Sequence, residues 1–123
     1  MELKVLKDKY KVVKLKPNEI IPKEIFEEEI YSITKTEEEL SVVVRSNLNI
    51  SNGIIEDNWS MIKIVGTLDF ALIGILSRIS NILASAEISI FALSTYNTDY
   101  ILLKSDKLEK AIEVLKQNGY IFR

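Results

Sequence analysis

Apolar residues recur at helical spacing in one stretch near the middle of the chain, and the segments around it show other patterns. Leucine and isoleucine side chains stand three and four residues apart, which places them on one face of a helix: Leu72, Ile75, Leu76, Ile79, Ile82 and Leu83. Asp69 stands where the N-cap of this helix is expected, because a carboxylate there accepts hydrogen bonds from the first turn. Residues 89–95 and 99–104 alternate as strands around a short polar turn. If these elements pack as one layer, the helix start and the turn rim one crevice.

Further strands and helices are predicted on both sides of this stretch. Only a brief helix, at 22–26, is expected around Pro17 and Pro22, because proline prevents a longer helix there. A second helix begins after Asp106, which forms a capping box with Glu109, and it ends before Gly119. Residues 54–55 are consistent with either a short edge strand or a packed loop. The remaining apolar runs predict strands at residues 4–6, 10–15, 31–36, 40–45, 59–65 and 120–122.

The order of these elements predicts the fold class. From residue 59 onward it is strand, helix, strand, strand, helix, strand, as in a ferredoxin-like βαββαβ unit with an antiparallel sheet and two helices on one face. The first half repeats the pattern, because IYSITKTEEELSVVV resembles IFALSTYNTDYILL. We therefore expect an α+β protein with two copies in tandem. Residues 1–56 form a degenerate half that lacks most of its second helix, and residues 57–123 form the complete domain.

Composition excludes several classes of function. The chain has 123 residues, a formal net charge of −2, no histidine and no cysteine. The charge and the lack of a basic stripe argue against nucleic-acid binding. The missing residue types exclude Cys and His nucleophiles, disulfides and nearly every zinc site, so we expect no metal and no cofactor. The apolar run 70–76 is far too short to span a membrane, and no leader begins at Met1, so we expect a cytoplasmic location.

Specific residues also carry a likeness to a known family. Leu68, Asp69, Phe70 and Gly74, followed by ISIFALSTYNTDYILLKSDKLEKAI, resemble the ACT domain. More narrowly, the chain resembles small bacterial tandem-ACT proteins related to the cytosolic arginine sensors of animals. The likeness runs from about residue 10 to the final strand and is strongest over residues 59–115. It implies a non-enzymatic regulatory module that binds an amino acid or a similar small metabolite between ACT units, here in a homodimer.

The resemblance also implies which residues contact the ligand. They come from the loop before the central helix, the helix itself, the hairpin after it, and a strand supplied by a neighbouring unit: Asp69 and Phe70, Leu72 and Leu76, Thr95, Tyr96 and Asp99, and Ser89 and Ile90. Asp99 stands at the acid that holds a cationic side chain. Asp69 replaces a glycine of the sensors and Leu72 replaces an acid, so the resemblance does not identify arginine as the ligand.

The chemistry of these residues suits an amino acid, although each residue also has an ordinary structural role. Free N–H groups at a helix start suit a carboxylate, Asp99 suits a cation, and Phe70 and Tyr96 can cover an apolar stem. Catalysis is disfavoured because no nucleophile or oxyanion donors accompany Asp69 and Asp99. The alternative is a structural or protein-interaction module whose crevice is filled by its own side chains.

Overall fold

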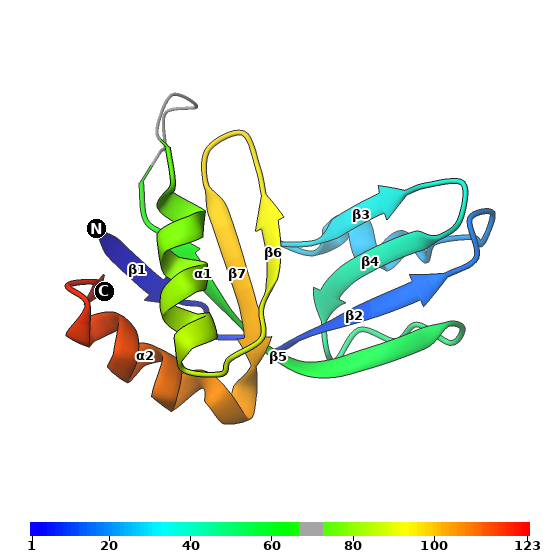
Figure 1. Ribbon diagram of the computed structural model, residues 1–123. Coiled ribbons are helices and arrows are strands. Elements are labelled where there is room, and N and C mark those ends of the chain that lie inside the picture. Colours follow the sequence, from blue (N-terminus) through cyan, green and yellow to red (C-terminus); the bar gives the residue numbers. More distant parts are fainter. Residues whose placement is uncertain (67–72) are drawn as a thin grey trace. The chain divides into compact units, whose positions relative to one another are not determined.

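The computed structural model describes residues 1–66 and 73–123, which divide into two compact units (Figure 1). Asp8–Asn58 form one unit, named here the N-terminal unit. Met1–Lys7 and Trp59–Arg123 form the other, named here the C-terminal unit, so both ends of the chain belong to it. The long strand β5 (Ile54–Ile64) passes from the first unit into the second.

The C-terminal unit contains a sheet with the strand order β8-β1-β5-β7-β6. From β5 onward the elements follow the predicted order of strand, helix, strand, strand, helix, strand, which is confirmed. A 3-10 turn, η2, leads into the second helix. The bounds are β1 (Glu2–Val5), α1 (Ile75–Ser85), β6 (Phe91–Ser94), β7 (Asp99–Lys104), η2 (Ser105–Lys107), α2 (Leu108–Gln117) and β8 (Ile121–Phe122).

The position of β1 makes this sheet mixed, so the prediction of a wholly antiparallel sheet is wrong. β1 pairs antiparallel with β5 and parallel with β8. It thus lies beside β5, where a simple βαββαβ sheet has its last strand. β8 has only two residues, whereas β1 has four and includes Leu3, which is fully buried opposite Ile64. β1 is the longer strand and therefore buries more apolar surface beside β5 than β8 could. Burial of apolar surface stabilises the fold, so the pairing of β1 with β5 is favoured.

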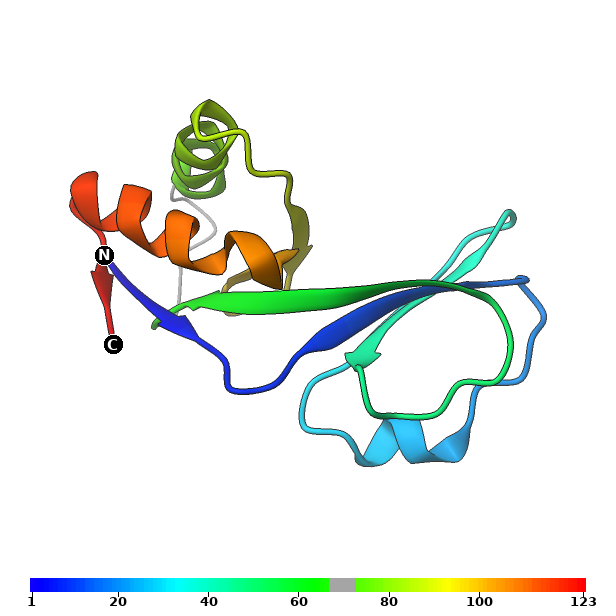
Figure 2. The same ribbon diagram turned by 90° about the horizontal axis from the view of Figure 1, so that it is seen from below.

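α1 and α2 cover the same face of this sheet, as predicted (Figure 2). Their apolar stripes meet the sheet in one core, in which Ile75, Ile79 and Leu83 come from α1. Ala111 and Leu115 come from α2. Each large side chain buried in this way contributes roughly 1.5–3 kcal/mol of transfer free energy. The predicted stripe is confirmed over residues 75–83, while Leu72 lies outside the described residues.

The predicted cap of the second helix is wrong, and the predicted cap of the first, Asp69, lies outside the described residues. The N-cap of α1 is Gly74, in the left-handed conformation (φ 78°). The N-cap of α2 is Lys107, with no side-chain cap hydrogen bond. Asp106 lies inside η2, which leads directly into α2, and this backbone turn takes the place of a capping box with Glu109.

The N-terminal unit is a smaller sheet with the order β3-β4-β2 and one short 3-10 helix. The predicted brief helix after Pro22 is confirmed as η1, and its Ile25 is fully buried in the core of this unit. The bounds are β2 (Tyr10–Leu15), η1 (Lys23–Glu27), β3 (Ser32–Lys35) and β4 (Leu40–Arg45).

Corresponding strands of the two units share one topology. β2-η1-β3-β4 and β5-α1-β6-β7 each place the third strand between the second and the first, with antiparallel neighbours. The hairpin registers also match, since Lys35 faces Leu40 and Ser94 faces Asp99. This agreement favours the interpretation of two copies, which stays a prediction, as does the boundary near residue 56.

Candidate functional site

The turn between β6 and β7 is closed by its own hydrogen bonds. The Thr95 backbone N–H donates to the Thr98 carbonyl at 2.9 Å, and the Thr95 hydroxyl donates to the same oxygen at 3.1 Å. The Thr98 N–H in turn donates to Thr95 Oγ1 at 3.3 Å. A threonine at the start of a turn stabilises it in this way because its hydroxyl satisfies turn backbone groups. Hydrogen bonds within the turn therefore help to hold its conformation.

Thr98 also ties this turn to the end of β5. Thr98 is 4% exposed, and its hydroxyl donates to the Ile64 carbonyl at 2.8 Å. Ile64 is the last residue of β5, so the hairpin is anchored where the chain leaves the sheet toward α1. The turn and the start of α1 lie at the same end of the unit (Figure 1). We did not predict a role for Thr98. The presence of two threonines in one short turn, Thr95 and Thr98, was the sequence signal that could have indicated it.

Asp99 presents an oriented carboxylate beside the turn. It is the first residue of β7 and is half-buried. The Ser94 hydroxyl donates to its Oδ1 at 2.6 Å. Among the described residues, Oδ2 accepts no hydrogen bond. A carboxylate with one oxygen held and the other available can receive a cation in a defined direction.

The structure brings only part of the predicted site together. Thr95 and Asp99 flank the turn, and Tyr96 stands on it with a side chain that is 79% exposed. Ser89 and Ile90 precede β6, whereas the turn follows β6, so within one chain the two groups lie at opposite ends of that strand. Leu76 on α1 and Ile90 are half-buried and pack against the core, while Ser89 is exposed. The other predicted contacts, Asp69, Phe70 and Leu72, lie outside the described residues.

The two surface depressions described here are lined by residues outside this hairpin. One, of about 580 Å³, is an open groove between α1 and α2 that includes Ile82, Lys110 and Val114. The other, of about 240 Å³, lies in the N-terminal unit and includes Lys14 and Glu38. Neither is lined by any of the predicted contact residues.

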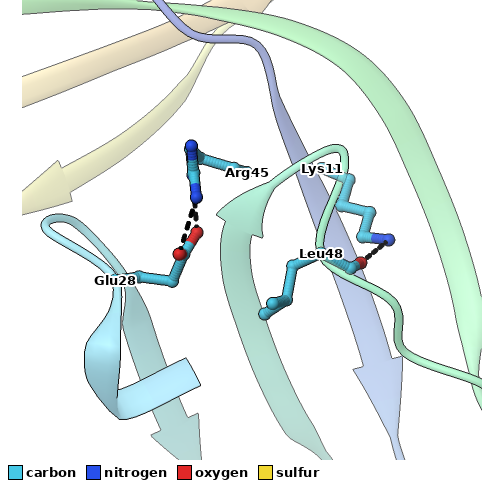
Figure 3. A network of polar contacts seen from close by, with 4 residues as sticks. All are labelled: Lys11, Glu28, Arg45 and Leu48. Atoms are coloured by element: carbon cyan, nitrogen blue, oxygen red, sulfur yellow. Dashed lines mark hydrogen bonds and ion pairs between the residues drawn. The ribbon is translucent and has the colours of Figure 1, made fainter. Parts of the chain in front are cut away.

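A polar cluster in the N-terminal unit serves its packing (Figure 3). Arg45 donates from Nε and Nη2 to the two carboxylate oxygens of Glu28, at 2.7 and 2.9 Å. These hydrogen bonds lower the pKa of Glu28 and raise that of Arg45. Burial raises the pKa of Tyr10, which faces Arg45 across the β2–β4 ladder. Lys11 is 6% exposed, and its ammonium donates to the Leu48 carbonyl at 2.6 Å.

Two searches of the described residues concern metal ligands and membrane-spanning helices. The described part of the chain contains no cluster of three or more His, Cys, Asp or Glu side chains placed to hold a metal ion. None of its helices combines the length and apolar character needed to cross a membrane.

Comparison with known protein families and structures gives evidence about the relatives of this chain that is independent of the site geometry. A family model of the ACT domain matches residues 54–117, and a second model, of an N-terminal domain, matches residues 8–52. Protein Atu0741 from Agrobacterium tumefaciens has a structure similar to this chain, with a TM-score of 0.91 and 30% identity. That similarity covers 99% of this chain and 91% of the other.

Two further comparisons give a partial sequence match and a shared fold. The human cytosolic arginine sensor for mTORC1, subunit 1, is 40% identical over 60 residues, which cover 48% of this chain and 18% of the sensor. This chain thus spans about a fifth of the length of the curated relatives it matches. The regulatory subunit of aspartate kinase from Thermus thermophilus shares the fold, with a TM-score of 0.64 and 12% identity over 91% of this chain and 93% of that one.

Proposed function

Since the chain belongs to the ACT-domain family, we propose that it is a non-catalytic regulatory module that binds an amino acid or a similar small metabolite. The similarity to a named arginine sensor supports the ligand class, although it covers 48% of this chain. The single observation that carries the proposal is the Asp99 carboxylate, which Ser94 orients beside a closed turn. An amino acid always has an ammonium group, and a fixed carboxylate is its natural partner.

The proposed site is built around the β6–β7 hairpin. Asp99 pairs with a cation of the ligand, and Tyr96 covers the ligand from the turn. Thr95 offers the remaining lone pair of its hydroxyl as an acceptor, because its O–H donates within the turn. Leu76 contributes apolar surface from α1. The resemblance adds Asp69, Phe70 and Leu72 from residues that the structure does not describe.

A second copy of the chain completes the site in this proposal. Ser89 and Ile90 precede β6 and are separated by its whole length from the turn of their own chain, since each strand residue adds about 3.3 Å. β6 pairs only with β7 among the described strands, and such an edge is suited to contact with another chain. We therefore expect a homodimer in which Ser89 and Ile90 of one protomer approach the ligand bound to the other. Sedimentation equilibrium giving a monomer mass at micromolar protein would contradict this arrangement.

A thermal-shift screen of the standard amino acids and common polyamines tests ligand binding. A ligand present at about a hundred times its dissociation constant stabilises the folded state by about 2.7 kcal/mol. For a chain of this size that raises the midpoint by several degrees. If none of the compounds moves the midpoint by a degree, the small-molecule function fails and the protein-interaction module takes its place. Mass spectrometry of the purified protein supplies a second readout, a retained amino acid.

A further inference from the structure

Two aromatic side chains lie exposed and in contact on the surface of the N-terminal unit. Phe26, in η1, is 59% exposed, and Tyr31, directly before β3, is 37% exposed. Their ring centroids are 5.7 Å apart and their planes meet at 87°, an edge-to-face contact. Aromatic side chains are enriched at the centres of protein–protein interfaces. These two residues, named here the aromatic pair, therefore mark a candidate docking surface.

The segment that carries the aromatic pair is anchored to the rest of its unit. Ile25, next to Phe26, is fully buried in the core of the N-terminal unit. Glu28, which lies between the two rings in the sequence, accepts hydrogen bonds from Nε and Nη2 of Arg45 at 2.7 and 2.9 Å (Figure 3). The Glu28 N–H also donates to the Ile25 carbonyl at 3.1 Å. The backbone that presents the rings is thus already ordered, so a partner loses little affinity to ordering it.

The same segment is acidic. Glu24, Glu27 and Glu29 are exposed, and their side chains form no ion pair or hydrogen bond with the described residues. Each lies one or two positions in the sequence from a residue of the aromatic pair, which is within the Debye length of about 8 Å at physiological salt. Lys23 supplies one opposing charge. The surface around the two rings therefore has a net negative charge.

Exposed rings beside carboxylates select the chemistry of the partner. An arginine side chain suits both groups, because its guanidinium stacks on aromatic faces and donates two hydrogen bonds to one carboxylate. The carboxylates repel nucleic acids and anionic membrane surfaces.

A second copy of this chain fits the aromatic pair less well than a basic partner does. The N-terminal unit has seven basic and eleven acidic residues, a net charge of −4, so two such units repel each other. Of the arginines in the chain, Arg45 and Arg123 already form ion pairs with Glu28 and Glu2. Charge complementarity therefore favours a different, basic protein.

We propose that the aromatic pair is the docking site for a basic segment of another protein. An arginine of that segment packs against Phe26 and Tyr31, and its neighbouring cations lie beside Glu24, Glu27 and Glu29. The docking site belongs to the N-terminal unit and shares no residue with the amino-acid site proposed above, so the two functions can be tested separately.

Amide chemical shifts of the full chain, titrated with a short synthetic peptide of alternating arginine and alanine, test the docking site. The proposal expects saturable shifts at residues 24–31. A peptide with lysine in place of arginine should bind about two- to fivefold more weakly, because an ammonium lacks the planar fork that stacks on a ring and pairs with a carboxylate. A peptide with glutamate in place of arginine should cause no shifts.

Two matched pairs of variants separate docking from general attraction by charge. Glu27→Gln and Glu37→Gln each remove one exposed carboxylate from the N-terminal unit, but Glu37 lies on the turn between β3 and β4. Phe26→Ala and Ile54→Ala each remove an exposed apolar side chain, but Ile54 lies at the start of β5. Glu27→Gln and Phe26→Ala should each weaken binding of the arginine peptide about two- to fivefold, and their partners should leave it unchanged.

Three results would overturn the docking site. The first is the absence of saturable shifts at residues 24–31. The second is an equal loss of affinity in Glu27→Gln and Glu37→Gln, which would show that net charge alone attracts the peptide. The third comes from sedimentation equilibrium of the chain without peptide: a dimer that becomes a monomer in Phe26→Ala would show that a second copy covers the aromatic pair.

Discussion

Replacing Asp99 with asparagine removes one charge from the proposed amino-acid site and preserves its shape. In the unsubstituted protein the Ser94 hydroxyl donates to Asp99 Oδ1 at 2.6 Å, and the amide oxygen of asparagine can accept the same hydrogen bond. The turn itself is closed by backbone and threonine groups that this substitution does not touch. The free energy of unfolding without ligand should therefore change by less than about 0.5 kcal/mol.

The effect on ligand affinity should be much larger. A hydrogen bond to a charged group contributes roughly 1.5–3 kcal/mol, which corresponds to about ten- to a hundredfold in the dissociation constant. Asp99 is only half-buried, so water screens part of this interaction. We therefore expect the lower end of the range, about tenfold weaker binding.

Isothermal titration calorimetry of wild type and variants measures this change, with the amino acid selected by the thermal-shift screen. Asp106→Asn is the matched control, because Asp106 is an exposed carboxylate in η2 and not on the hairpin. Ser94→Ala keeps the charge of Asp99 and frees its orientation, so a smaller loss of a few-fold is expected. Unchanged affinity in Asp99→Asn, with the fold intact, would show that this carboxylate is only a turn residue.

Three other predictions test the physical reasoning behind the fold. Thr98→Val removes the buried hydrogen bond to the end of β5, so urea denaturation should show a loss of about 1–2 kcal/mol, with Thr98→Ser retaining most of the stability. Gly53→Ala should destabilise by more than about 1 kcal/mol and more than Gly119→Ala, because both have positive φ but only Gly53 lacks room for a Cβ; equal losses would refute the packing argument. Arg45 lowers the pKa of Glu28 below its usual 4.5, so the ion pair stabilises the fold above that pH and the benefit is lost as the pH falls through the lowered pKa. The stability difference between wild type and Glu28→Gln should therefore be constant near neutral pH and shrink below about pH 4.5, whereas a constant difference down to pH 2 would contradict the pKa assignment.

The sequence by itself determined the elements, because side-chain periodicity reports directly which face of an element is buried. Residues 75–83 show helical spacing and pack as α1, and β2, β4 and β7 have the predicted bounds. The likeness to the ACT domain was also available from local residues, and the family comparison confirms it. The candidate role of Asp99 came from the same local pattern and is a prediction still.

Only the tertiary structure decided which segments, far apart in the sequence, lie next to each other in the fold. No pattern in Glu2–Val5 tells that this strand, and not β8, pairs with β5, since that choice depends on the relative burial of segments far apart in the chain. The hydrogen bond from Thr98 to Ile64 joins residues 34 positions apart, so local propensity carries no signal for it. The N-cap of α1 at Gly74 is likewise set by where the helix meets the core, since Ile75 directly after it is buried there. The depression beside Gly53, in the N-terminal unit, forms because the chain before β5 lies against the end of β2. These two segments are far apart in the sequence, so no local pattern indicates their contact.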